Sequence, residues 1–115
     1  MRVCALERHN MLRIYNVILG LLEELRPVVK RVELRDRDLG RQLRRASCSI
    51  ALNVAEGMYS RGGNRQVRYH TALGSARETL SCLEIAQRCG SGAAPSALHA
   101  QLNQIIGTLV KLVGL

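Results

Sequence analysis

Residues 39–65, LGRQLRRASCSIALNVAEGMYSRGGNR, decide the fold. Apolar or small residues recur there every three or four positions, which predicts one narrow apolar stripe on a helix. The members of this stripe are Leu39, Leu43, Ala46, Ile50, Val54 and Gly57. At roughly 100° per residue, a set of arginines falls on the opposite side: Arg37, Arg41, Arg44 and Arg45. The sequence SRGGN then breaks the helix, and Asn64 is the expected cap of the next one.

Three further helical patterns complete the chain. With the central one, they predict helices over residues 7–26 or beyond, 38–58, 64–88 and 95–112. Pro27 either kinks the first helix or starts a new turn, and we expect a kinked helix that continues. The charged segment VELRDRDLG (32–40) forms a long connection in this interpretation, with Asp36 or Asp38 as the cap of the second helix. Pro95 suits the first position of the fourth helix.

Short connections between the later helices favour antiparallel neighbours. The predicted fold class is therefore all-α: an antiparallel up-down-up-down four-helix bundle, with residues 1–115 as a single domain. Apolar residues make up 47% of the chain, enough for a core, although aromatic residues are scarce.

The third predicted helix has two apolar faces. One consists of Tyr69, Leu73, Ala76, Leu80 and Leu83. The other consists of Val67, Thr71, Gly74, Cys82, Ile85 and Cys89. A bundle helix buries one face, so we expect the second face to be a subunit interface of a homo-oligomer; a broad intramolecular face is the alternative.

Positive charge is concentrated in one part of the sequence. The formal net charge is +8, and fifteen of the seventeen basic residues are arginine, whose planar fork binds phosphate in a bidentate way. Between positions 26 and 68 there are eleven basic residues and four acidic ones. This bias favours a polyanionic partner, although arginines that only increase solubility would give the same composition.

The chain offers little for cofactors, metals or membranes. No apolar stretch reaches the ~18 residues that a membrane span needs, and Glu7 and His9 interrupt any secretory segment. We therefore expect a cytoplasmic protein that has no cofactor. The four cysteines lack metal-ligand spacing and are expected to be small buried apolar residues. Three isolated histidines predict no metal site.

Two segments resemble a known family. Residues 49–57, SIALNVAEG, followed by Arg61, and residues 73–90, LGSARETLSCLEIAQRCG, are similar to the 23S ribosomal RNA intervening-sequence proteins. That family includes the accessory variability determinant of diversity-generating retroelements. The resemblance covers nearly the whole chain. It implies a ring-shaped homopentamer of four-helix bundles, with a basic surface implicated in binding nucleic acid and a reverse transcriptase.

The polar members of that motif have a structural interpretation. Asn53 and Glu56 are three residues apart and therefore neighbour each other on one helix, just before Gly57. We expect Glu56 to pair with an arginine of a neighbouring helix, such as Arg77, or to cap a backbone, and Asn53 to find internal partners.

Nucleic-acid binding without catalysis is the leading functional hypothesis. The expected binding residues form one patch, in which backbone contacts dominate and Tyr59 or Tyr69 supplies the stacking. They are Arg37, Arg41, Arg44, Arg45, Arg61, Arg65 and Arg68. The partner is RNA, DNA or a hybrid, and a reverse transcriptase is a further possible partner.

Two alternatives remain at this point. The basic face instead docks an acidic protein, and the chain is an adaptor. Alternatively, Arg65 and His70, spaced as Arg-x-x-x-x-His, resemble the motif of HEPN ribonucleases, in which these side chains promote attack of a ribose 2′-hydroxyl on phosphate.

Overall fold

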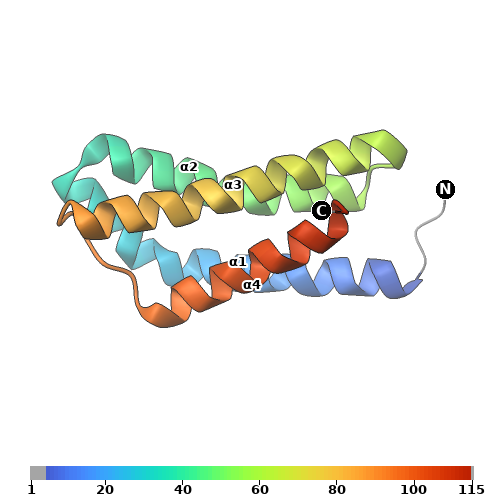
Figure 1. Ribbon diagram of the computed structural model, residues 1–115, viewed down its shortest axis with the longest axis horizontal. Coiled ribbons are helices and arrows are strands. Elements are labelled where there is room, and N and C mark those ends of the chain that lie inside the picture. The colour runs from blue at the N-terminus through green and yellow to red at the C-terminus, as the bar shows by residue number, and fades with distance from the viewer. Residues whose placement is uncertain (1–4, 115) are drawn as a thin grey trace.

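The chain folds into four helices packed along a common direction. The computed structural model describes residues 5–114, with side chains from residue 10 onward, and this part of the chain is all-α. The helices are α1 (Ala5–Arg35), α2 (Arg37–Met58), α3 (Gly62–Arg88) and α4 (Ser96–Leu112). The bundle measures 47 × 22 × 22 Å. In Figure 1 the chain runs toward the left in α1 and α3 and toward the right in α2 and α4.

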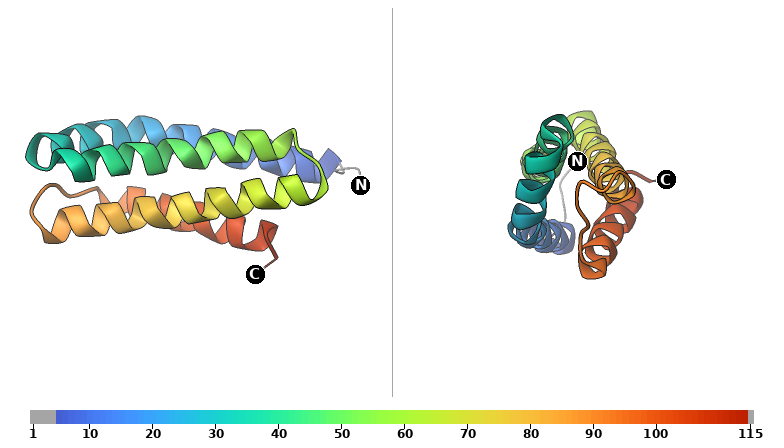
Figure 2. Two further views of the ribbon diagram at one scale, coloured as in Figure 1. Left: turned by 90° about the horizontal axis from the view of Figure 1, so that it is seen from above. Right: turned by 90° about the vertical axis from the view of Figure 1, so that its left-hand side faces the viewer.

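Each helix contributes one line of apolar side chains to a shared core. Figure 2 shows α1 and α2 in one layer and α3 and α4 in the other. All members of the predicted α2 stripe are buried. In α1 the buried line follows the heptad spacing of Met11, Ile14, Ile18, Leu21, Leu25, Val28 and Val32. Contacts link α1 with α2, α2 with α3, α3 with α4 and α4 with α1.

Helix α1 continues through Pro27, as expected. Pro27 lies on the exposed side of the helix. The carbonyl of Glu23, which loses its intrahelical donor, also belongs to an exposed residue, where water can hydrogen-bond it. The proline therefore costs one backbone bond without ending the helix.

The predicted long connection between the first two helices is wrong. Only Asp36 lies outside a helix there, because its Oδ1 accepts a hydrogen bond from the Leu39 amide at 3.0 Å and so starts α2 at once. Gly40 permits this tight corner: a Cβ at this position would lie 2.7 Å from the Cα of Glu33.

The starts of α3 and α4 also differ from prediction. Asn64 is not a cap, since α3 begins at Gly62, whose φ of +56° makes the turn, and Asn64 lies inside the first turn. Pro95 is the cap residue of α4 rather than its first helical residue. Helix α3 ends at Arg88, and Gly90, whose φ is +77°, allows the amides of Gly90 and Ser91 to bond carbonyls of the last turn.

Candidate nucleic-acid interface

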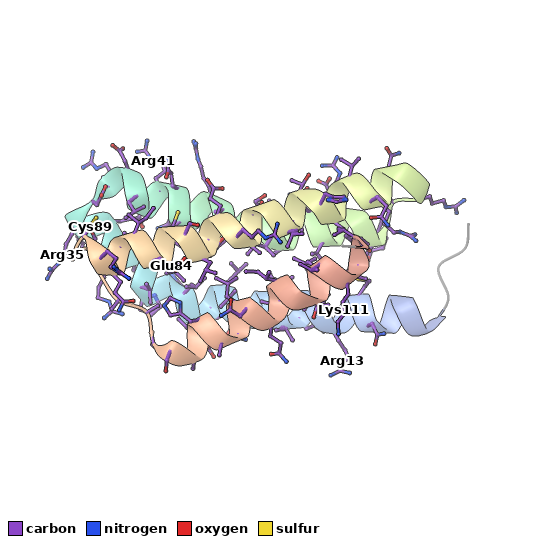
Figure 3. The ribbon with its side chains drawn as sticks, viewed as in Figure 1. Arg13, Arg35, Arg41, Glu84, Cys89 and Lys111 are labelled. Atoms are coloured by element: carbon purple, nitrogen blue, oxygen red, sulfur yellow. The ribbon has the colours of Figure 1, made fainter. Side chains whose placement is uncertain are left out.

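Three arginines on α2 project from the bundle. Arg37, Arg41 and Arg45 are exposed and spaced four residues apart, so they follow one side of the helix for about 12 Å. Figure 3 shows Arg41 pointing outward near the end where α1 meets α2. Within residues 10–114, none of the three makes an ion pair or a side-chain hydrogen bond, and neither does the neighbouring Asp38. We call Arg37, Arg41 and Arg45 the open arginine row.

Arg44, the fourth predicted arginine of α2, is tied to α1. Its guanidinium pairs with the carboxylate of Glu33. It also borders a shallow groove of about 150 Å³ between α1 and α2. The groove is lined by Leu22, Leu25, Arg26, Val29, Arg44, Ser47 and Cys48. Arg44 is therefore less available to a ligand than the open arginine row.

The arginines that follow α2 have structural partners. Arg65 donates from Nε and Nη2 to the carbonyl of Ser60, at 3.0 and 2.7 Å, and from Nε to that of Gly57 at 3.3 Å. Arg68 Nη1 pairs with Glu56 Oε2 at 2.9 Å. Arg61 is exposed and makes no such contact with the described side chains. Arg65 thus closes the C-terminal end of α2, whose last carbonyls lack intrahelical donors.

The structure separates what the sequence grouped into one patch. About 20 Å of helix lies between Arg45 and Met58, at 1.5 Å per residue. The open arginine row and the Arg61–Arg68 cluster therefore lie at opposite ends of α2. The prediction of one joined surface is wrong because residues 45–58 belong to one continuous helix, which holds the two groups of arginines this far apart.

Basic residues of α1 lie near the open arginine row, and this was not predicted from the sequence. Arg26 lines the groove beside α2, and Lys30 follows it one turn later, exposed. Arg35 donates from Nη1 to the carbonyl of Gly90 at 3.3 Å, and Figure 3 shows Arg35 beside Cys89 at this end of the bundle. The heptad spacing of α1, carried past Pro27, was the signal that could have placed them here.

The two tyrosines expected to stack on bases differ. Tyr59 is 87% exposed. Tyr69 is buried against Gly57, where a Cβ would overlap the Tyr69 ring and lie 2.7 Å from its Cδ1, so the stacking prediction for Tyr69 is wrong. Of these two tyrosines only Tyr59 is exposed, and it lies at the far end of α2 from the open arginine row.

The comparisons with known proteins show the family to which the chain belongs. The family model described as 23S rRNA-intervening sequence protein matches residues 10–112. The chain belongs to this family. No curated protein and no solved structure matches it significantly.

The motif that carries the family resemblance makes internal contacts. Asn53 Nδ2 donates to the carbonyl and to Oγ of Ser49, at 2.9 and 3.0 Å. Ser75 of α3 donates to the same Ser49 Oγ at 2.8 Å. Glu56 pairs with an arginine of the neighbouring helix, as expected, but the partner is Arg68 rather than Arg77. The motif therefore joins α2 to α3.

The positions of Arg65 and His70 do not favour a catalytic pair. Their spacing places them about 140° apart around α3. His70 is exposed, whereas the Arg65 guanidinium is engaged by backbone carbonyls. This arrangement favours the structural role of Arg65.

The cysteines depart from the prediction of uniform burial. Cys48 and Cys89 are exposed, Cys82 is buried, and Cys4 lies outside the described residues. Burial, together with the charge of Glu78, raises the pKa of the Cys82 thiol. Within residues 5–114 no group of His, Cys, Asp and Glu is arranged to hold a metal ion, and no helix is long and apolar enough to cross a membrane.

Proposed function

We propose that this member of the family is a non-enzymatic scaffold that binds the phosphate backbone of nucleic acid through the open arginine row. One observation carries the proposal: Arg37, Arg41 and Arg45 are exposed on one helix face without a partner among the described residues. Over the ~12 Å that they span, duplex DNA carries about seven phosphate charges.

The proposed mode of binding is electrostatic. Arginine pairs with phosphate in a bidentate way, and each contact releases counterions, so affinity falls steeply with salt and depends little on sequence. RNA, DNA and a hybrid duplex all present such a backbone. Residues 37–45 contain no aromatic side chain that could stack on a base, which supports backbone contacts over base recognition.

The proposed assembly is a ring-shaped homopentamer of up-down-up-down bundles in the cytoplasm. Repetition of the open arginine row around a ring raises the affinity for a long polyanion through avidity. In a retroelement, the same assembly would serve as an accessory subunit of a reverse transcriptase, the partner that the family resemblance implies.

A protein adaptor is the second candidate function. The shallow groove between α1 and α2 has an apolar floor beside Arg26 and Arg44, which suits an acidic partner. Binding of such a partner would tolerate salt better than binding of a polynucleotide, because apolar burial adds to the charge contacts.

Electrophoretic mobility shifts test the proposal, with single-stranded RNA and duplex DNA titrated at several salt concentrations. The triple variant Arg37/Arg41/Arg45→Glu is expected to lose binding. The matched control is Arg13/Arg77/Lys111→Glu, which reverses three other exposed basic residues and changes the net charge equally. Equal loss in both variants would assign binding to net charge alone, and no binding by the folded wild-type protein at low salt would reject nucleic acid as the ligand.

A further inference from the structure

The outer side of α1 carries a second seam of heptad spacing, one position after the buried line. Its members are Leu12, Tyr15, Leu19, Leu22, Arg26 and Val29. Helix α2 covers Val29 and part of Leu22, but Leu12 is 49% and Leu19 37% exposed. Alternate steps of three and four residues are the spacing with which one helix packs against another. We call this set the α1 outer seam.

Helix α3 carries an uncovered seam of the same spacing. Its members are Val67, Thr71, Gly74, Glu78, Ser81 and Ile85. Val67 and Ile85 are 62% and 49% exposed, and a Cβ at Gly74 would meet nothing within 4 Å. Cys82, which the sequence placed on this face, is buried in the core instead. We call this set the α3 outer seam.

We infer that the α1 outer seam of one copy packs against the α3 outer seam of a second copy, with Arg26 facing Glu78. This contact deepens the proposed ring assembly and depends on that part of the proposed function. Matching the two heptads sets Leu19 against Thr71 and Leu22 against Gly74, so large side chains of α1 meet small ones of α3. Arg26 and Glu78 are each exposed, and neither makes an ion pair with a described residue of its own chain.

The heights of residues along the bundle give the same pairing independently. Arg26 lines the groove with Ser47, so these two lie at about the same height. Two residues farther along α2, Ser49 is bonded to Ser75 of α3. Because α2 and α3 run in opposite directions, the level of Ser47 falls two or three residues beyond Ser75 on α3, close to Glu78.

Cyclic symmetry makes this agreement meaningful. Rotation about an axis parallel to the long axis of the bundle changes no residue's height, so Arg26 of one copy can meet only α3 residues near its own level in the next copy. Figure 1 shows α1 and α3 running in the same direction, and such a rotation keeps them parallel. The heptad spacing allows registers seven residues apart, and the heights select the register that sets Arg26 against Glu78.

The contact is heterologous, since α1 of one copy meets α3 of the next. Each copy then contacts two neighbours, one through its α1 outer seam and the other through its α3 outer seam. Such contacts close into a ring when the rotation allows. In an isologous contact, by comparison, one face of each copy would meet the same face of the other, and the assembly would stop at two copies.

Sedimentation velocity of two seam variants, separately and mixed, tests the inference. Leu19→Lys spoils the α1 outer seam and Gly74→Trp blocks the α3 outer seam. Matched controls are Val17→Lys, at an α1 residue of equal exposure outside the seam, and Gly107→Trp, at an α4 glycine with equally open surroundings. Circular dichroism verifies that every variant is folded.

The expected result is a large assembly for the wild type and both controls, and single copies for each seam variant. The mixture is expected to form a one-to-one complex of two copies, because one intact α1 seam and one intact α3 seam remain. A wild type that sediments as single copies, seam variants that assemble normally, or a mixture without a complex would each overturn the inference.

Charge exchange gives a second measurement. Arg26→Glu and Glu78→Arg should each weaken assembly, and the double variant should restore it; failure of restoration would reject the Arg26–Glu78 pairing. These measurements contain no nucleic acid, and the seam variants keep Arg37, Arg41 and Arg45. Loss of assembly is thereby distinguished from failure of the proposed nucleic-acid binding.

Discussion

The two ends of α2 carry arginines with opposite uses. At the start of α2, Arg37, Arg41 and Arg45 are exposed without partners among the described residues. Beyond its end, Arg65 caps the last carbonyls and Arg68 pairs with Glu56. Residue type is the same and net charge is similar, but only the first set can exchange water for a ligand without breaking an internal contact. Availability, rather than arginine content, therefore marks the candidate interface.

The largest expected effect is on nucleic-acid binding, when the charges of the open arginine row are reversed. With Arg37/Arg41/Arg45→Glu, we expect at least a ~100-fold loss of affinity for duplex DNA at low salt, because three phosphate contacts become repulsive. The slope of log affinity against log salt should also fall by about 2–3. Mobility shifts across salt concentrations measure both quantities. An unchanged slope would mean that these arginines do not contact phosphate.

Substitutions near the C-terminal end of α2 should change the stability of the fold instead. Gly57→Ala is expected to lower the free energy of unfolding by about 1–3 kcal/mol, because its Cβ would overlap the Tyr69 ring. Urea denaturation measures the change. Gly107→Ala is the control: it adds the same methyl group to an open helical site and should stabilise by about 0.5–1 kcal/mol. Equal effects at both positions would show that the Tyr69 contact does not matter.

Arg65 tests whether the second cluster is structural. Arg65→Met should lower the free energy of unfolding by about 1–2 kcal/mol, since the carbonyls of Ser60 and Gly57 lose a charged donor. Its affinity for nucleic acid should change little. Arg61→Met should leave stability unchanged, because Arg61 makes no ion pair or side-chain hydrogen bond with a described residue. If the affinity at Arg65→Met fell while stability held, the two ends of α2 would share one binding function.

The smallest expected effect concerns Arg44, which is exposed like the open arginine row but has an ion-pair partner like Arg68. Glu33→Gln removes its carboxylate partner and should tighten binding of nucleic acid about two- to threefold, because an exposed ion pair is worth at most about 1 kcal/mol. Fluorescence anisotropy with labelled RNA resolves such a change. Weaker binding in this variant would show that the Glu33–Arg44 pair itself shapes the interface.

Local signals predicted the helices better than their ends. The apolar stripe of α2, the passage of α1 through Pro27 and the Asp36 cap all depend on neighbouring residues, and all three are confirmed. The start of α3 was misplaced because Gly62 makes the turn without a capping side chain. The predicted arginine patch failed for another reason: the helix from Arg45 to Met58 holds the two groups about 20 Å apart, and contacts with α2 engage Arg65 and Arg68.

The sequence by itself determined that this chain is all-α, which residues build its core, and that arginine dominates its surface, because helical periodicity and charge are properties of neighbouring positions. Only the tertiary structure decided which arginines are available. Arg44 is engaged by Glu33 of α1, Arg68 by Glu56 of α2, and Arg65 by the end of α2. Those partners lie on different helices or across a turn, and a side chain's availability depends on what packing brings beside it.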